Sequence, residues 1–111
     1  MSTPQERIDA IKANYDQAAD NEAEDLANAK TAVEVAGVRA NVGNARLAYY
    51  TAIAAALSSN GTDVEAAHQE AKDALLAVKE ARTAVERMAT LLGKLAKATD
   101  KANKLLQKAK A

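Results

Sequence analysis

Five lysines with helical spacing are the residues best suited to binding a charged partner. Lys94, Lys97, Lys101, Lys104 and Lys108 step by three and four along the chain, which places them on one face of a helix. Such a basic stripe can contact the phosphates of a nucleic acid or the headgroups of anionic lipids. No arginine or aromatic residue interleaves the lysines, and the formal net charge of the chain is +0. Nucleic acid and membrane are therefore the weaker expectations for a partner.

The other titratable residues form no recognisable catalytic or metal-binding pattern. His68 is the one histidine and there is no cysteine, so disulfides, a thiolate nucleophile and a Cys-based metal site are excluded. The acids Glu22, Glu24 and Asp25 lack the spacing of a calcium-binding loop. No glycine motif that would cradle a phosphate occurs. We expect no enzymatic activity, no cofactor and no small-molecule substrate.

The composition predicts that helices carry all of these residues. Hydrophobic residues make up 49% of the 111, but many are alanine; there are three Tyr, no Phe or Trp, four Gly and one Pro. Alanine has the highest helix propensity of the amino acids, and a chain rich in Ala, Glu, Lys and Leu is typical of long helices or coiled coils. The predicted fold class is all-α.

The sequence also predicts the cellular location of the chain. The first residues lack the basic-then-apolar layout of a signal peptide. The longest nearly apolar run, 45–57, is interrupted by Arg46 and is shorter than the ~20 residues that span a bilayer. We expect a soluble chain, cytoplasmic or associated with a virion.

Capping patterns predict two long helices in a single domain, 1–111. Thr3 and Glu6 flank Pro4 in the pattern of a capping box at a helix start. Residues 58–61 read Ser-Ser-Asn-Gly and are the strongest helix breaker in the chain. A second capping pattern, Thr62 to Glu65, follows at once. The prediction is a helix over 4–58, a turn at 59–62 and a helix over 63–109.

A heptad repeat in each predicted helix favours an antiparallel hairpin with coiled-coil packing. The first seam runs through 19, 22, 26, 29, 33, 36, 40, 43, 47, 50, 54 and 57, and the second through 64, 67, 71, 74, 78, 81, 85, 88, 92, 95, 99, 102, 106 and 109. Folding the chain at 60–61 places Leu47 opposite Ala74 and Gly43 opposite Val78. The two polar seam residues, Glu22 and Thr99, also fall opposite each other.

The charges are distributed asymmetrically in a way that fits the same hairpin. Residues 1–34 contain eight acids and three bases, whereas residues 88–111 contain six lysines and one acid. In the hairpin register Lys97 lies beside Asp25, Lys101 beside Asp20, and Lys104 beside Asp16. Surface pairs of this kind contribute ~0–1 kcal/mol each, so they would select orientation more than they stabilise.

Two glycines leave an alternative fold open. Gly37 and Gly43 each cost about 1 kcal/mol in a helix interior. A break near residues 41–44 would give a three-helix bundle in place of the hairpin. We favour the continuous helix because the heptad keeps its phase through Gly43.

A second apolar stripe on the first helix is the candidate interaction surface. Its residues, together with a leucine of the second helix, are Val35, Val38, Val42, Tyr49, Ile53 and Leu76. In an isolated hairpin this stripe would face water, and a large exposed apolar patch usually marks an interface. We expect a homo-oligomer in which hairpins form a multi-helix bundle through this stripe. The alternative is a three-helix fold that buries the stripe internally.

These observations point to a non-enzymatic coiled-coil protein that acts through protein–protein interaction or self-assembly. A scaffold, an adaptor, a structural or assembly subunit, for example of a virion, and an inhibitor all fit this description. One alternative is an amphipathic protein that coats a membrane or another surface. A further alternative is a nucleic-acid-associated protein that uses the lysine stripe.

Overall fold

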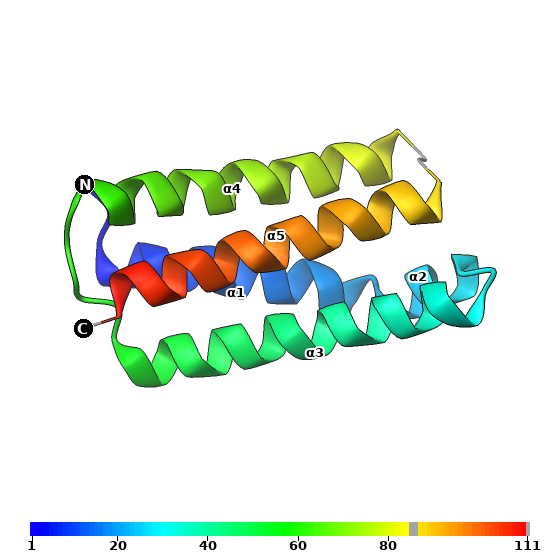
Figure 1. Cartoon of the computed structure of the whole chain (residues 1–111), viewed down its shortest axis with the longest axis horizontal. Helices are drawn as coiled ribbons and strands as arrows, with labels where there is room; N and C mark the ends of the chain where they lie inside the picture. The colour runs from blue at the N-terminus through cyan, green and yellow to red at the C-terminus, as the bar shows by residue number, and fades with distance from the viewer. Residues whose placement is uncertain (85–86, 111) are drawn as a thin grey trace.

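A computed structural model describes residues 1–84 and 87–110, and this part of the chain folds into five helices (Figure 1). The helices are α1 (Pro4–Asp20), α2 (Glu22–Asn28), α3 (Ala32–Ala55), α4 (Thr62–Thr83) and α5 (Met88–Ala109). They pack into a body whose Cα atoms extend over 42 × 24 × 18 Å. The all-α prediction is confirmed, but the two-helix hairpin is wrong.

The four long helices lie roughly parallel to one another and alternate in direction along the chain (Figure 1). Helix α3 packs against α1 and α5, α4 packs most extensively against α5, and α1 also contacts α5 and α4. The short α2 follows α1 and packs against the beginning of α3. Four apolar stripes therefore meet in one bundle, which buries more surface than one pair of helices.

The predicted helix 4–58 is interrupted twice. Helix α1 starts as expected: the Thr3 hydroxyl accepts a hydrogen bond from the Glu6 amide (3.1 Å), and the Glu6 carboxylate accepts one from the Thr3 amide (2.8 Å). The helix ends at Asp20, where the Asn21 side-chain amide donates to the Gln17 carbonyl (2.7 Å). That side chain satisfies a carbonyl at the helix end, so the chain stops and restarts at this position.

A second interruption falls at residues 29–31. Thr31 caps α3, with its hydroxyl accepting from the Glu34 amide (3.1 Å), while the Glu34 carboxylate accepts from the Lys30 amide (2.8 Å). Helix α3 then continues through both Gly37 and Gly43. The expected continuity through Gly43 is therefore confirmed, the alternative of a break near 41–44 is wrong, and the chain turns ten residues earlier.

The segment after α3 turns the chain sharply. Ala56 (φ 67°) and Leu57 (φ 49°) both lie in the left-handed region, which is costly for residues with a Cβ. The Leu57 side chain is completely buried, and burial of this leucine helps to offset the cost. The predicted breaker at 58–61 is confirmed as a loop between α3 and α4.

The predicted helix 63–109 is also two helices. Helix α4 ends at Thr83 and α5 begins at Met88, so α5 runs back antiparallel along α4 (Figure 1). No side chain caps α4 in a capping box, because its N-cap is Gly61 and the Glu65 carboxylate instead accepts from Ser2. Val85, one of the predicted seam positions, lies outside the described residues.

A buried polar layer separates two apolar clusters. One cluster, around Ile11 and Leu105, lies toward the end that holds both termini, and the other surrounds Val78 and Leu95. Between them the Asn14 amide donates to the Thr99 hydroxyl (3.1 Å), and that hydroxyl donates to the Asn41 carbonyl oxygen (2.7 Å). Thr99 thus belongs to a polar layer, but its predicted partner Glu22 is wrong.

Candidate functional site

Four of the six large hydrophobic side chains that are exposed among the described residues lie on the outward side of α3. We call it the α3 outer face, and its residues, all exposed, are Val33, Ala36, Ala40, Gly43, Leu47, Tyr50 and Ala54. Val33 is 81% exposed, Leu47 67% and Tyr50 56%. These residues step by three and four, which is the spacing of a coiled-coil seam. An apolar heptad seam thus lies on the surface, and among the described residues only Tyr15 of α1 makes a ring contact with it, at Tyr50.

This result reverses the predicted roles of the two apolar stripes of α3. Val38 and Val42 belong to the proposed interface, but they are 1% and 3% exposed and lie in the core of this chain. Val35 and Tyr49 are half-buried. The predicted pairing of Leu47 with Ala74 is also wrong, since Leu47 is exposed and Ala74 is buried against residues of α5.

The remaining two residues of the predicted interface are exposed but lie apart. Ile53 is 53% exposed on α3 and borders the α3 outer face next to Ala54. Leu76 is 54% exposed on α4, between the exposed Lys72 and Lys79. Since single exposed leucines are common on protein surfaces, Leu76 alone indicates no interface.

Three tyrosines cluster where α1 meets the α3 outer face. The rings of Tyr15 and Tyr49 stack with centroids 5.9 Å apart, and Tyr50 lies 6.3 Å from Tyr15 and 5.8 Å from Tyr49. Tyr49 fixes α1 against α3, while Tyr50 continues the cluster out to the surface. Rigid, partly exposed tyrosines are common energetic anchors of protein interfaces.

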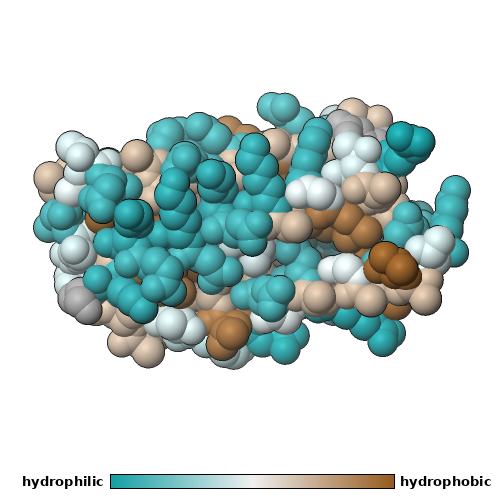
Figure 2. Space-filling view, in the orientation of Figure 1, coloured by the Kyte–Doolittle hydropathy of each residue, from teal (hydrophilic) through white to brown (hydrophobic). Residues whose placement is uncertain are grey.

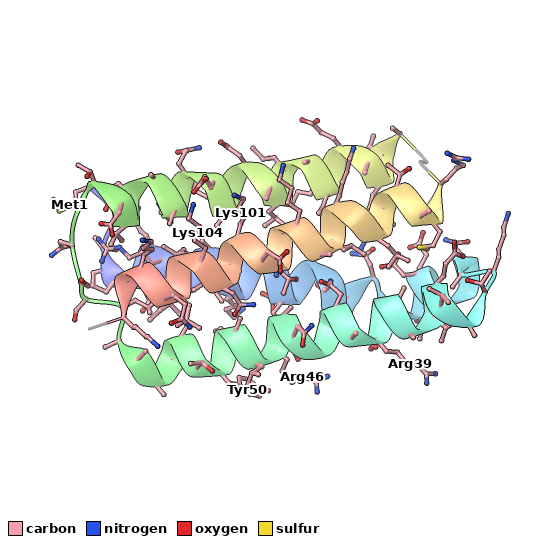
Figure 3. The ribbon with its side chains drawn as sticks, viewed as in Figure 1. Met1, Arg39, Arg46, Tyr50, Lys101 and Lys104 are labelled. Atoms are coloured by element: carbon pink, nitrogen blue, oxygen red, sulfur yellow. The ribbon has the colours of Figure 1, made fainter. Side chains whose placement is uncertain are left out.

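Two arginines line one edge of the α3 outer face. Arg39 and Arg46 are exposed, and Figure 3 shows them with Tyr50 on the side of α3 that faces away from α4 and α5. A hydrogen bond with Tyr15 raises the pKa of Arg46, and Glu22 of α2 adds an attractive charge. Between Glu34 and Asp63 the sequence contains no acid. The edge therefore carries positive charge that α3 itself does not balance.

The predicted lysine stripe forms, but it pairs with a different helix. Lys101 and Lys104 both reach Glu70 of α4, with N–O distances of 3.4 and 3.0 Å. These two lysines lower the pKa of Glu70, Lys104 having the larger effect. Figure 3 shows both on the side of α5 that faces α4. The expected pairs with Asp16 and Asp20 of α1 are wrong.

The rest of the stripe is similarly balanced by acids. Lys108 lies 4.0 Å from Asp63, and Lys94 and Lys97 border a groove of about 260 Å³ between α4 and α5, which Glu70 and Asp73 also line. Figure 2 shows hydrophilic side chains covering most of this face, while hydrophobic residues reach the surface between the right-hand parts of α5 and α3. The stripe is a mixed-charge surface and is poorly suited to phosphate binding.

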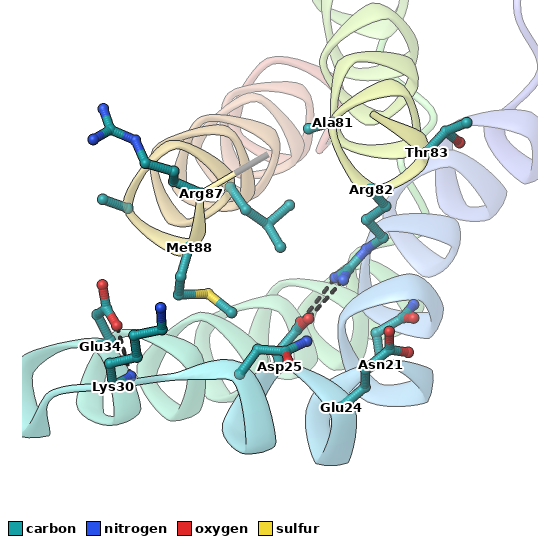
Figure 4. A pocket seen from close by; sticks show the side chains of 13 residues that line it. Asn21, Glu24, Asp25, Lys30, Glu34, Ala81, Arg82, Thr83, Arg87 and Met88 are labelled. Atoms are coloured by element: carbon teal, nitrogen blue, oxygen red, sulfur yellow. Dashed lines mark hydrogen bonds and ion pairs between the residues drawn. The ribbon is translucent and has the colours of Figure 1, made fainter. Parts of the chain in front are cut away.

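An open cleft of about 840 Å³ lies at one end of the bundle, between α2, the end of α4 and the start of α5 (Figure 4). Arg82 and Asp25 form a bidentate ion pair in this cleft, with N–O distances of 2.7 and 2.9 Å. Three acids and three bases line the cleft, so it favours neither anions nor cations. Among the described residues, no group of His, Cys, Asp and Glu could hold a metal ion.

Two arginines, Arg7 buried and Arg82 half-buried, are the features that sequence reasoning missed. Arg7 is fully buried and donates to the carbonyl oxygens of Leu57 and Ser59, both at 2.8 Å, and to the Glu65 carboxylate at 3.1 Å. Arg82 takes Asp25, which was expected to face Lys97. Both arginines connect segments more than 50 residues apart, so no local pattern reveals them. They hold the bundle together and point to no reaction.

Comparisons with known proteins add no further assignment. No protein-family model, no curated protein and no solved structure matches the chain. In the part of the chain that the structure describes, no helix combines the length and apolar character needed to cross a bilayer.

Proposed function

We propose that this protein is a non-enzymatic interaction module that binds a helix of another protein subunit on the α3 outer face. One observation carries the proposal: an apolar heptad seam lies on the surface of a bundle whose other apolar stripes are buried. We keep the function expected from the sequence, protein–protein interaction, but assign it to the α3 outer face, which lies on the side of α3 opposite the stripe that contains Val38 and Val42.

The size and shape of the surface support a helix as the bound element. The α3 outer face and Ile53 together form a contiguous exposed apolar surface, and such surfaces often mark interaction sites. Helix α3 has 24 residues and is about 36 Å long, so a partner helix would have room for several turns. At the centre of the face Ala40 and Gly43 are small, which lets two helix backbones approach closely.

The Gly43 position fits this proposal in a second way. A Cβ added to Gly43 would have no neighbour within 4 Å, whereas one added to Gly37 would touch the Leu92 side chain at 3.4 Å. Gly37 therefore faces α5, where an added Cβ would only just fit. Gly43 faces open space in the described chain, and a helix seated on the α3 outer face would pack closely there.

The experiment compares two leucines of similar exposure on different helices. Leu47→Glu places a charge in the α3 outer face, and Leu76→Glu places the same charge on α4. Because both side chains are exposed, both variants should unfold within about 0.5 kcal/mol of the native protein. Association is measured by sedimentation equilibrium of each protein alone and by titration with a synthetic 21-residue amphipathic helix that has leucine and alanine at its seam positions.

The proposal predicts that Leu47→Glu weakens the association observed, with the protein itself or with the synthetic helix, by at least tenfold. Leu76→Glu should leave it unchanged. If both variants associate as the native protein does, or if the native protein binds neither itself nor the helix, the α3 outer face is not a docking surface.

A further inference from the structure

The two arginines at the edge of the α3 outer face indicate the charge of the helix that this face binds. Arg39 and Arg46 are seven residues apart, one heptad, and lie on the same edge of the seam, about 10 Å apart along the helix. Within residues 1–84 and 87–110, Arg39 makes no hydrogen bond or ion pair. The opposite edge of the seam carries the uncharged Asn44 and Thr51.

A second copy of this chain is a poor match for that edge. In an antiparallel pair of α3 helices, like edges face each other, so Arg39 of one copy would lie beside Arg46 of the other. In a parallel pair the arginine edge would face Asn44 and Thr51 of the partner copy. Neither arrangement brings an α3 acid to the arginines, and like charges placed together oppose association.

An anionic membrane is also a poorer match than a helix. A membrane-binding face gains from large apolar side chains along its whole length, but the middle of this face is formed by Ala36, Ala40 and Gly43. Small residues at heptad spacing suit a helix that packs closely, with its larger side chains against them. Small residues add little buried apolar area on a lipid surface.

We infer that the partner is an acidic amphipathic helix whose apolar seam packs on the α3 outer face and whose carboxylates, one heptad apart, pair with Arg39 and Arg46. This inference rests on the proposed function and specifies the chemistry of its partner. Arginine is suited to the role because its planar guanidinium pairs with a carboxylate through two hydrogen bonds. The arginine edge would select the partner and its direction, while the apolar seam would supply most of the affinity.

Two synthetic helices of 21 residues test the inference. Both carry leucine and alanine at the seam positions; one has glutamate at the flanking positions and the other has lysine. Their affinities for the native protein are measured by calorimetry at low and high salt. The protein variant is Arg39→Glu/Arg46→Glu, and its control is Lys72→Glu/Lys79→Glu, which reverses two exposed charges at the same spacing on α4.

We expect the native protein to prefer the glutamate helix by about tenfold, since two exposed ion pairs of ~0.2–1 kcal/mol each give a factor of roughly 2 to 30. The preference should shrink with added salt. Arg39→Glu/Arg46→Glu should reverse it in favour of the lysine helix. Lys72→Glu/Lys79→Glu has the same net charge as the first variant but should keep the native preference.

Other outcomes separate this inference from the proposed function. If both helices bind equally well and Leu47→Glu abolishes both, the face docks helices but the arginines do not select them, and the inference is overturned while the proposed function stands. If Leu47→Glu has no effect on either helix, the proposed function fails. If vesicles of phosphatidylserine and phosphatidylcholine bind with a dependence on Leu47 and Arg46, and neither helix does, the partner is a membrane and both statements are wrong.

Discussion

Removing the Arg7 side chain should destabilise the bundle more than removing any other charged side chain described. Arg7 lies at the start of α1 with no exposed surface. Its five N–H groups reach six acceptors at 2.8–3.1 Å, with one N–H of Nη2 shared between two of them: two on Ser2 of the N-terminal segment, three on the loop residues Leu57, Ser59 and Asn60, and one on Glu65 of α4. One side chain therefore ties together three segments of the chain.

The size of the loss follows from what the substitution leaves behind. In Arg7→Ala the Leu57 carbonyl, which is buried with its residue, loses its partner, and Glu65 loses the cation that the described chain bonds to it. The Glu65 side chain is 32% exposed and can be rehydrated, so the loss comes mainly from buried acceptors left without a partner, at about 1–3 kcal/mol each. A small domain has only about 5–15 kcal/mol of stability in total. Arg7→Lys keeps the charge but cannot reproduce the fork of donors, so we expect about half of that loss.

Urea unfolding followed by circular dichroism at pH 7 measures both variants, with Arg39→Ala as the control. Arg39 is an exposed arginine without a bonded partner in the described chain, so its removal should change the free energy of unfolding by less than about 0.5 kcal/mol. A loss below 1 kcal/mol for Arg7→Ala, or equal losses for Arg7→Ala and Arg39→Ala, would refute the assigned role of Arg7.

Four further outcomes are expected. Asp25→Asn should lower the free energy of unfolding by about 2–3 kcal/mol, and a double-mutant cycle with Arg82→Met should show coupling of at least 1 kcal/mol; additive losses would contradict the ion pair. Thr99→Val should cost about 1–3 kcal/mol because it leaves two buried asparagines short of a partner, whereas Thr99→Ser should lose less than half as much in the same urea assay. Ala56→Gly should raise stability by about 0.5–1 kcal/mol, since glycine adopts the left-handed conformation without strain; a fall in the unfolding midpoint would argue against that conformation. Finally, the lowered pKa of Glu70 means that its carboxylate stabilises the fold above the unfolded-state value near 4.5, and that this contribution is lost as the pH falls through the lower folded-state value. Glu70→Gln should therefore flatten the loss of stability below about pH 4.5, and an unchanged acid limb would contradict the pairing.

The capping patterns in the sequence located the helix ends better than the heptad repeat did. The pattern Thr-x-x-Glu identified the cap at Thr3 and a helix start at Thr62, and the same pattern occurs at Thr31 and again at Thr83. Thr31 caps α3, and α4 ends at Thr83. A continuous heptad shows that one face is apolar but not that the helix is unbroken, because a short loop costs little compared with the burial that two more packed helices gain.

The choice of which α3 face turns inward could not be predicted from the sequence. Both stripes of α3 are apolar and both keep helical spacing, so local patterning favours neither. What distinguishes the two stripes is a set of long-range contacts. Asn41, on the inward side, is hydrogen-bonded to Thr99 of α5, which in turn is hydrogen-bonded to Asn14 of α1. A residue 58 positions away therefore decides which side of α3 is buried and which is left for a partner.

The most direct test of the docking surface is an NMR map of bound residues. Amide spectra of the ¹⁵N-labelled native protein are recorded during titration with the glutamate helix. The proposal predicts shifts concentrated at Val33, Ala40, Gly43, Leu47 and Tyr50, with the α4 and α5 lysines unaffected. Shifts centred on the lysine stripe or on the cleft around Arg82, or no shifts at a saturating concentration of the helix, would contradict the assignment of the α3 outer face as the functional surface.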